Sequence, residues 1–145
     1  LTDGRLAADE AGVLARAAAA GVTTVVVNGL NPSDNAAVLA LAARAGGMPR
    51  TVAPVIRPAL GFYPVDTVLP EMLAAGVDYP RTEPVVTAEQ GIAWLQDHIG
   101  EAFAVGEIGL DRYWVPEAFW EAQEAAFVQL VGLAMASDKP IIIHT

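Results

Sequence analysis

Short β-branched runs alternate along this chain with longer segments whose apolar residues recur at helical spacing. Val22–Val27 is a continuous β-branched run, which is typical of a parallel strand covered on both faces. Ile141–Ile143, directly before His144, is a similar apolar run. We expect strands at about 22–27, 51–62, 103–105 and 141–144, and helices at about 5–20, 31–44, 87–99 and 116–137.

Capping residues mark the ends of several of these helices. Gly21 follows the first helix in the position that a left-handed cap requires. Thr87 is a predicted N-cap, with Glu89 and Gln90 in the first turn. Pro116 suits the first turn of the last helix. These signals support a regular alternation of helices and strands.

Prolines make the middle of the chain harder to interpret. Pro54 and Pro58 weaken the stretch at 51–62 as a central strand, because proline cannot donate a hydrogen bond to a ladder. Residues 63–86 hold four further prolines and a short helical piece near Leu69–Ala75. A connection of this length is often a functional loop.

The order of elements predicts one α/β domain over residues 1–145. Strands separated by helices require right-handed crossovers and a parallel sheet, and either a doubly wound sheet or part of a (β/α) barrel satisfies this. The chain begins with Leu1 and stops one residue after His144. Because parallel sheets do not normally leave an apolar terminal edge strand uncovered, we expect both ends to be cut and the domain to be incomplete.

The composition allows a packed core and argues against several functional classes. Of the 145 residues, 54% are hydrophobic, none is cysteine, and the net charge is −9. A disulfide framework and a thiolate metal site are therefore excluded. The sequence holds no basic patch of the kind that binds nucleic acid through charge alone. An enzyme whose bound metal ions meet a phosphate is compatible with this charge.

The chain also lacks signals for a membrane or secretory location. No apolar run approaches the roughly 18 residues that a membrane helix needs, and charged residues interrupt the first ten positions. We expect a cytoplasmic protein with no membrane partner and no obligate protein partner.

Five polar residues follow the predicted strands at the ends where α/β enzymes place their catalytic groups. They are Asn28, Tyr63, Glu107, Asp111 and His144. A carboxylate such as Glu107 and an imidazole such as His144, at the mouths of neighbouring parallel strands, can converge on one ion. This donor pair suits zinc, manganese or a related divalent metal.

Each of these residues also has a simpler interpretation. Glu107 can be a helix-cap partner or a solvated loop charge, and His144 can be a histidine satisfied at a sheet edge. Asp111 is typical of a turn or cap, and Asn28 with Gly29 is typical of a turn. The chain has no dinucleotide-binding glycine motif, Walker loop or nucleophile-elbow motif. A nucleotide-cofactor oxidoreductase, a P-loop NTPase and an α/β-hydrolase are therefore disfavoured.

Several motifs at linked spacing resemble those of the TatD family of metal-dependent hydrolases. Val105–Asp111, VGEIGLD, is similar to the family signature GE[IC]GLD. The helix at 119–134 resembles the family's pattern of spaced phenylalanines, glutamines and leucines, and Pro140–His144, PIIIH, resembles its P-[VI]-x-I-H. Gly61–Pro64, GFYP, looks like a variant of G-x-H-P, and Val22–Asn28 resembles the second strand.

The resemblance implies a (β/α) barrel that binds two divalent metal ions, zinc, magnesium or manganese. Glu107 would be the catalytic carboxylate shared by both metals, and His144 would bind one of them. The chain would cover about strands two to five of a partial TIM-type barrel. Leu1 would then follow the family's D-x-H-x-H motif, and further ligands would lie beyond Thr145.

The resemblance also implies that Tyr63 and Asp111 bind substrate. Tyr63 stands where the family usually has a histidine, and Arg112 follows Asp111 where a tyrosine is common. These departures, together with the long segment at 63–86, point to a divergent branch of the family.

The implied activity is hydrolysis of DNA phosphodiester bonds by a metal-activated water. Two alternatives stay open. The first is an amidohydrolase-like enzyme that cleaves an amide, ester or lactone through the same metals. The second is that this stretch of chain is catalytically incomplete and has no activity of its own.

Overall fold

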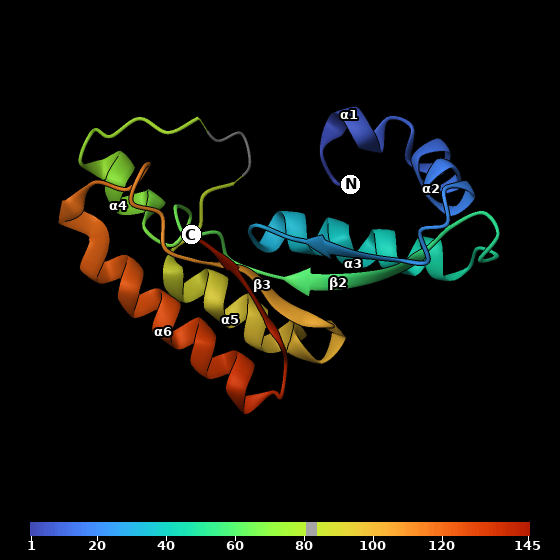
Figure 1. The fold of residues 1–145 in the computed structure, drawn as a ribbon. Coiled ribbons are helices and arrows are strands. Elements are labelled where there is room, and N and C mark those ends of the chain that lie inside the picture. The colour runs from blue at the N-terminus through green and yellow to red at the C-terminus, as the bar shows by residue number, and fades with distance from the viewer. Residues whose placement is uncertain (81–83) are drawn as a thin grey trace.

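The chain forms an alternating series of helices and parallel strands (Figure 1). The computed structural model describes residues 1–80 and 84–145. The strands are β1 (Thr24–Asn28), β2 (Val55–Leu60), β3 (Ala104–Gly109) and β4 (Ile141–His144). The helices are α1 (Gly4–Ala7), α2 (Glu10–Ala19), α3 (Pro32–Gly46), α4 (Leu69–Ala74), α5 (Ala88–His98) and α6 (Trp120–Ala136). The 3₁₀ turns are η1 (Ile99–Glu101), after α5, and η2 (Glu117–Phe119), before α6.

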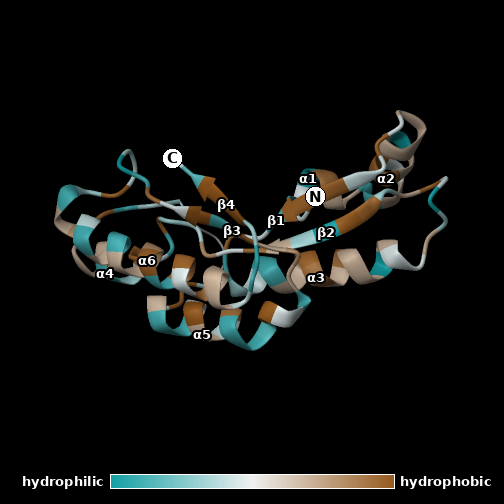
Figure 2. Cartoon of the chain, turned by 60° about the horizontal axis from the view of Figure 1, so that its bottom comes forward, coloured by the Kyte–Doolittle hydropathy of each residue, from teal (hydrophilic) through white to brown (hydrophobic). Residues whose placement is uncertain are grey.

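The four strands form one parallel sheet in the order β1-β2-β3-β4, which is also their order along the chain. A doubly wound sheet reverses its strand order at a switch point, whereas an unbroken consecutive order is that of a barrel. The sheet curls into half a barrel (Figures 1 and 2). The prediction of a partial TIM-type (β/α) barrel is confirmed.

Helices α3, α5 and α6 cover one face of this sheet (Figure 2). One apolar core joins α2 and α3 to β1 and β2, and includes Leu14, Leu41 and Ile56. A second core joins α5 and α6 to β2 and β3, and includes Leu95 and Leu130. Burial of these apolar side chains stabilises the packing of the helices on the strands. The strands can then hold polar side chains in fixed positions on the opposite face of the sheet.

The first predicted helix is wrong in one respect, because residues 5–20 form two helices. Asp9, between α1 and α2, has a non-helical φ of −131° and is the N-cap of α2. Its carboxylate accepts a hydrogen bond from Arg16 at 2.9 Å. The Asp9 side chain makes no capping hydrogen bond to the first turn of α2, so the two helices are separated by the non-helical backbone at Asp9 without a side-chain cap.

β2 lies between β1 and β3 in the sheet and contains Pro58. The prolines of this segment had argued against a central strand. Pairing with β3 starts at Ala59 and Ala104, one residue later. The missing N–H of Pro58 therefore removes no bond from that ladder. Its carbonyl oxygen accepts a hydrogen bond from the Phe103 N–H at 2.8 Å.

The predicted caps at Gly21 and Thr87 are confirmed, whereas the predicted helix at 116–137 starts later: Pro116 is extended, the 3₁₀ turn η2 follows it, and α6 begins at Trp120. Gly21 has a φ of +83°, in the left-handed region that favours glycine. Thr87 and Gln90 form a reciprocal capping box at the start of α5. In the long segment at 63–86, α4 is the predicted short helical piece, and residues 81–83 lie outside the described residues. No helix in the described part of the chain is both long and apolar enough to cross a membrane.

Candidate functional site

An irregularity in β3 turns Glu107 away from the helices. Val105 and Ile108 both lie in the core beneath α5 and α6, although regular alternation puts residues three apart on opposite faces of a strand. The pairing of β3 with β4 shifts register between these two residues, as it does at a β-bulge. The extra residue leaves the Glu107 side chain on the face opposite the core.

Glu107 and His144 meet at the ends of neighbouring strands. Glu107 Oε1 lies 2.7 Å from His144 Nδ1, and the two side chains are 25% and 24% exposed respectively. The structure therefore brings together the two residues that the sequence selects as metal ligands.

The loop after β2 packs directly on the backbone of Glu107. A Cβ atom on Gly61 would lie 2.2 Å from the Glu107 nitrogen, so only glycine allows this approach. The fully buried Asn35 of α3 holds the loop in place: its amide nitrogen donates to Gly61 O at 2.8 Å, and its Oδ1 accepts the Gly61 N–H at 3.0 Å.

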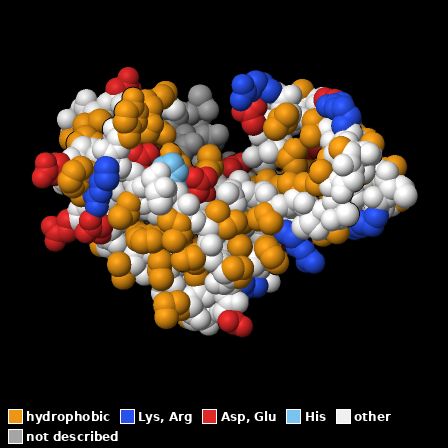
Figure 3. All heavy atoms as spheres, viewed as in Figure 1, with side chains coloured by type: hydrophobic (Ala, Val, Ile, Leu, Met, Phe, Trp, Pro, Cys, Tyr) orange, Lys and Arg blue, Asp and Glu red, His pale blue; other side chains and the backbone are white. Residues whose placement is uncertain are grey.

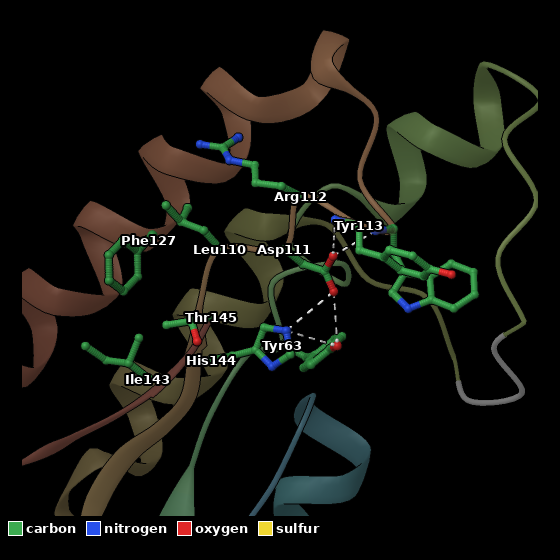
Figure 4. Close-up of a pocket in the computed structure, with 10 residues that line it drawn as sticks. Tyr63, Leu110, Asp111, Arg112, Tyr113, Phe127, Ile143, His144 and Thr145 are labelled. Atoms are coloured by element: carbon green, nitrogen blue, oxygen red, sulfur yellow. Dashed lines mark hydrogen bonds and ion pairs between the residues drawn. The ribbon is translucent and has the colours of Figure 1, made fainter.

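Asp111 reaches the same place from the loop after β3 (Figure 4). Its Oδ1 accepts the N–H groups of Tyr113 and Trp114 at 2.9 and 2.8 Å, so it is a turn residue, as its simpler interpretation predicts. Its Oδ2 lies 3.4 Å from His144 Nε2, and the side chain is only 5% exposed. Asp111 thus shapes its own loop and also faces the histidine.

Tyr63 is the fourth member of this group. Its hydroxyl donates to Asp111 Oδ2 at 3.3 Å and lies 3.5 Å from His144 Nε2. Its ring packs edge-on against His144, with 4.9 Å between centroids. Burial first, and then the negative charge of Asp111, raise the pKa of Tyr63 well above its ordinary value of 10.0. The hydroxyl therefore keeps its proton and acts as a donor.

Gln123 on α6 connects the two loops, and sequence reasoning missed this role. It is fully buried. Its Oε1 accepts the Asp111 N–H at 3.0 Å, and its Nε2 donates to Pro64 O at 3.2 Å. The sequence does place Gln123 among the apolar residues on the buried face of its helix. A buried amide needs hydrogen-bond partners for both its oxygen and its nitrogen, so this position could have been recognised as a link to other parts of the chain.

A cavity of about 650 Å³ opens beside these side chains (Figure 4). Tyr63, Asp111 and His144 form its polar wall, and Leu110, Phe127 and Ile143 contribute apolar surface. A mainly apolar pocket with a few convergent polar groups is the usual form of a ligand site.

Asn28, the fifth candidate, lies at the end of β1 and stays outside this group of contacts. Its Oδ1 atom is buried, and no described residue donates a hydrogen bond to it. We assign it no part in the site.

The donor chemistry at this site fits a divalent metal. An imidazole nitrogen and a carboxylate oxygen are the donors that zinc or manganese take, and Glu107 and His144 present both at a close distance. Among residues 1–80 and 84–145, no group of three or more histidine, cysteine or acidic side chains is arranged to hold an ion. In the described part of the chain, Glu107 and His144 thus offer one carboxylate and one imidazole, and no complete ligand set is present.

The family model for TatD-related DNases matches residues 1–145. The chain belongs to this family. The predicted resemblance is thereby confirmed, and with it the fold of a TatD-type hydrolase. The family is generally metal-dependent, which agrees with the donors at the strand ends.

A solved structure supports the same conclusion. The chain is similar to YjjV, a TatD homologue from Escherichia coli K12, at 28% sequence identity and a TM-score of 0.67. The match covers 94% of this chain and 44% of the YjjV chain. This TatD-family chain therefore spans less than half the length of that relative. Among curated proteins, no sequence matches.

Proposed function

We propose that the intact protein is a metal-dependent hydrolase that cleaves phosphodiester bonds of DNA. The observation that carries the proposal is the contact between Glu107 and His144, 2.7 Å apart at adjacent strand ends, with Asp111 beside them. The family's description as TatD-related DNases supports the choice of DNA. Because the chain spans 44% of YjjV, the activity is proposed for the whole protein.

Glu107 and His144 would hold the metal ions, with Glu107 shared between two of them. Bound zinc, magnesium or manganese lowers the pKa of water and neutralises charge that develops on a phosphoryl oxygen. We expect residues 1–145 alone to be inactive, because their described part offers too few donors for two ions.

Asp111 and Tyr63 would position the substrate. The Asp111 carboxylate fixes the Tyr63 hydroxyl at 3.3 Å, and both side chains line the cavity. Because its one proton is donated to Asp111, the Tyr63 hydroxyl held in this way would offer its oxygen as an acceptor to a substrate N–H or O–H group. Gln123 would keep the two loops in register, since it bonds to the backbone of Asp111 and of Pro64.

A second candidate is hydrolysis of an amide, ester or lactone through the same metals. The observation in its favour is the apolar part of the cavity wall, formed by Leu110, Phe127 and Ile143. The net charge of −9 also favours this candidate, because a negatively charged protein does not attract a polyanion such as DNA over long range.

Substrate profiling of the full-length protein separates the two candidates. The protein would be stripped of metal, reloaded with zinc, magnesium or manganese, and assayed on labelled single-stranded DNA and on chromogenic esters and lactones. We expect metal-dependent cleavage of the DNA. Turnover of the esters or lactones without cleavage of DNA would favour the second candidate, and no turnover of any of them would contradict both.

A further inference from the structure

Asn35 is a polar residue in a position that the fold otherwise fills with apolar side chains. It is fully buried on α3, whose other buried residues are Val38, Leu41 and Ala45. Its amide forms two hydrogen bonds with the backbone of one residue in the loop after β2, the N–H and the carbonyl oxygen of Gly61. Burial of an amide is unfavourable unless both of its ends are paired in this way. The side chain therefore fixes the loop after β2 against α3, which an apolar residue of the same size would not do.

The loop after β1 is held at the same point. A Cβ atom on Gly29 would overlap the Oδ1 atom of Asn35, so the amide packs directly on the Gly29 backbone. The Gly29 N–H donates to Ala59 O at 2.9 Å, at the end of β2. The Tyr63 N–H donates to Leu30 O at 2.7 Å. These bonds join the loops after β1 and β2 to each other, and Asn35 joins both loops to α3.

Both loops contact the backbone of Glu107. The Glu107 N–H donates to Gly29 O at 3.3 Å, and Gly61 lies against the same nitrogen. The Glu107 side chain extends from this point to His144. A shift of either loop would thus move the carboxylate relative to the imidazole, and a metal site needs its ligands held to within about 0.5 Å of the binding geometry.

No side-chain cation fixes the Glu107 carboxylate in place of these contacts. Among the described residues, no lysine or arginine forms an ion pair with Glu107. On the face drawn in Figure 3, basic side chains (blue) are scattered and do not gather around the histidine (pale blue). The position of the carboxylate therefore depends on the backbone contacts that Asn35 organises.

We propose that Asn35 is a positioning residue for the metal site, which acts on Glu107 through Gly29 and Gly61 and touches no metal ion itself. This rests on the proposed function, in which Glu107 is a metal ligand. Loss of the amide would leave the buried N–H and carbonyl groups of Gly61 without partners, and the loop after β2 would shift. Glu107 would then hold its carboxylate less firmly beside His144, so metal ions would bind more weakly.

The test is calorimetric titration of the metal-free, full-length protein with zinc or manganese, and the Tm of each variant is measured beside it. Asn35→Leu keeps the size of the side chain but removes the amide. It should raise the metal Kd about 10- to 100-fold, as removal of a partner behind a metal ligand does. Asn35→Ser leaves room for a water molecule that bonds to Gly61, and it should raise the Kd toward the lower end of that range. If the leucine variant does not fold, the serine variant decides the question.

Val38→Ala is the matched control, because Val38 is equally buried on α3 but lies in the apolar core. It should lower the Tm and leave the metal Kd unchanged. A wild-type Kd in the folded Asn35 variants, or a Kd raised as much in Val38→Ala, would overturn the positioning role and leave the proposed function standing. If the wild type binds no metal, the proposed function and this inference both fail. Metal binding that depends on Asn35 in a protein that cleaves no DNA would support the positioning role and contradict only the choice of DNA.

Discussion

The two ends of the parallel sheet differ in chemistry. At the carboxyl ends of the strands, Glu107, Asp111 and His144 are mostly buried polar groups in contact with one another. At the amino ends, large apolar side chains such as Phe103 and Ile141 are exposed, alongside polar ones such as Thr24. A polar contact at this end is the hydrogen bond that the Lys139 side chain donates to the backbone oxygen of Ala102.

This difference separates chemistry from stability. In (β/α) barrels, the carboxyl ends of the strands carry the active site, and the amino ends contribute to folding. Substitutions at the carboxyl end should therefore lower activity more than stability, and substitutions at the amino end should do the reverse. The following experiments test this separation in the full-length protein.

Glu107→Gln should have the largest effect. It keeps the shape of the side chain but removes the charge that would hold the metals. We expect metal-dependent turnover to fall by more than about 100-fold, because even the partners behind metal ligands contribute about 10- to 100-fold. The Tm should change little. Full activity in this variant would remove Glu107 from the site.

Gln123→Leu should lower both stability and activity, because Gln123 lies behind the carboxyl end. The buried Asp111 N–H and Pro64 carbonyl would both lose their partner, at a cost of about 2–4 kcal/mol in the free energy of unfolding. Loosening of Asp111 should also reduce kcat. Gln123→Glu, which keeps the acceptor for Asp111, should retain more activity than the leucine variant. Equal activity in both would show that this hydrogen bond does not position the site.

Lys139→Met tests the amino end. Lys139 Nζ donates to Ala102 O at 2.5 Å, just before β3. Loss of this charge-assisted bond should lower the free energy of unfolding by about 1–2 kcal/mol, as measured by denaturant titration. The kcat should be unchanged. A drop in kcat without a drop in stability would contradict the separation of the two ends.

Glu10→Gln should have the smallest effect. The hydrogen bond from Arg44 holds the pKa of Glu10 below its ordinary value of 4.5. A carboxylate with a depressed pKa stabilises the folded state above that ordinary value, and the contribution is lost as the pH falls through the folded pKa. The variant should thus melt slightly below the wild type at pH 7 and level with it well below pH 4. A difference that persists in acid would rule out this ion pair as its cause.

The sequence predicted the general fold because local signals agree with it. The β-branched run before Asn28 and the apolar run before His144 are both strands, and the caps at Gly21 and Thr87 lie where expected. The rule that active groups follow parallel strands then selected Glu107 and His144, which the structure places in contact.

Long-range features were not predictable in the same way. The register shift in β3 that turns Glu107 depends on pairing with β4, and periodicity within one strand does not contain that information. The hydrogen bonds of Gln123 to Pro64 and of Asn35 to Gly61 join residues far apart in sequence. Both amides lie on helices, where their sequence pattern indicated only a buried face.

The most direct test of the central claim is the metal content of the full-length protein, measured by calorimetric titration of the metal-free form with zinc or manganese. We predict two ions per chain in the wild type, loss of tight binding in Glu107→Gln, loss of one ion in His144→Ala, and unchanged binding in Phe103→Ala at the opposite end of β3. Wild-type stoichiometry and affinity in both Glu107→Gln and His144→Ala would contradict the assignment of the metal site to these strand ends.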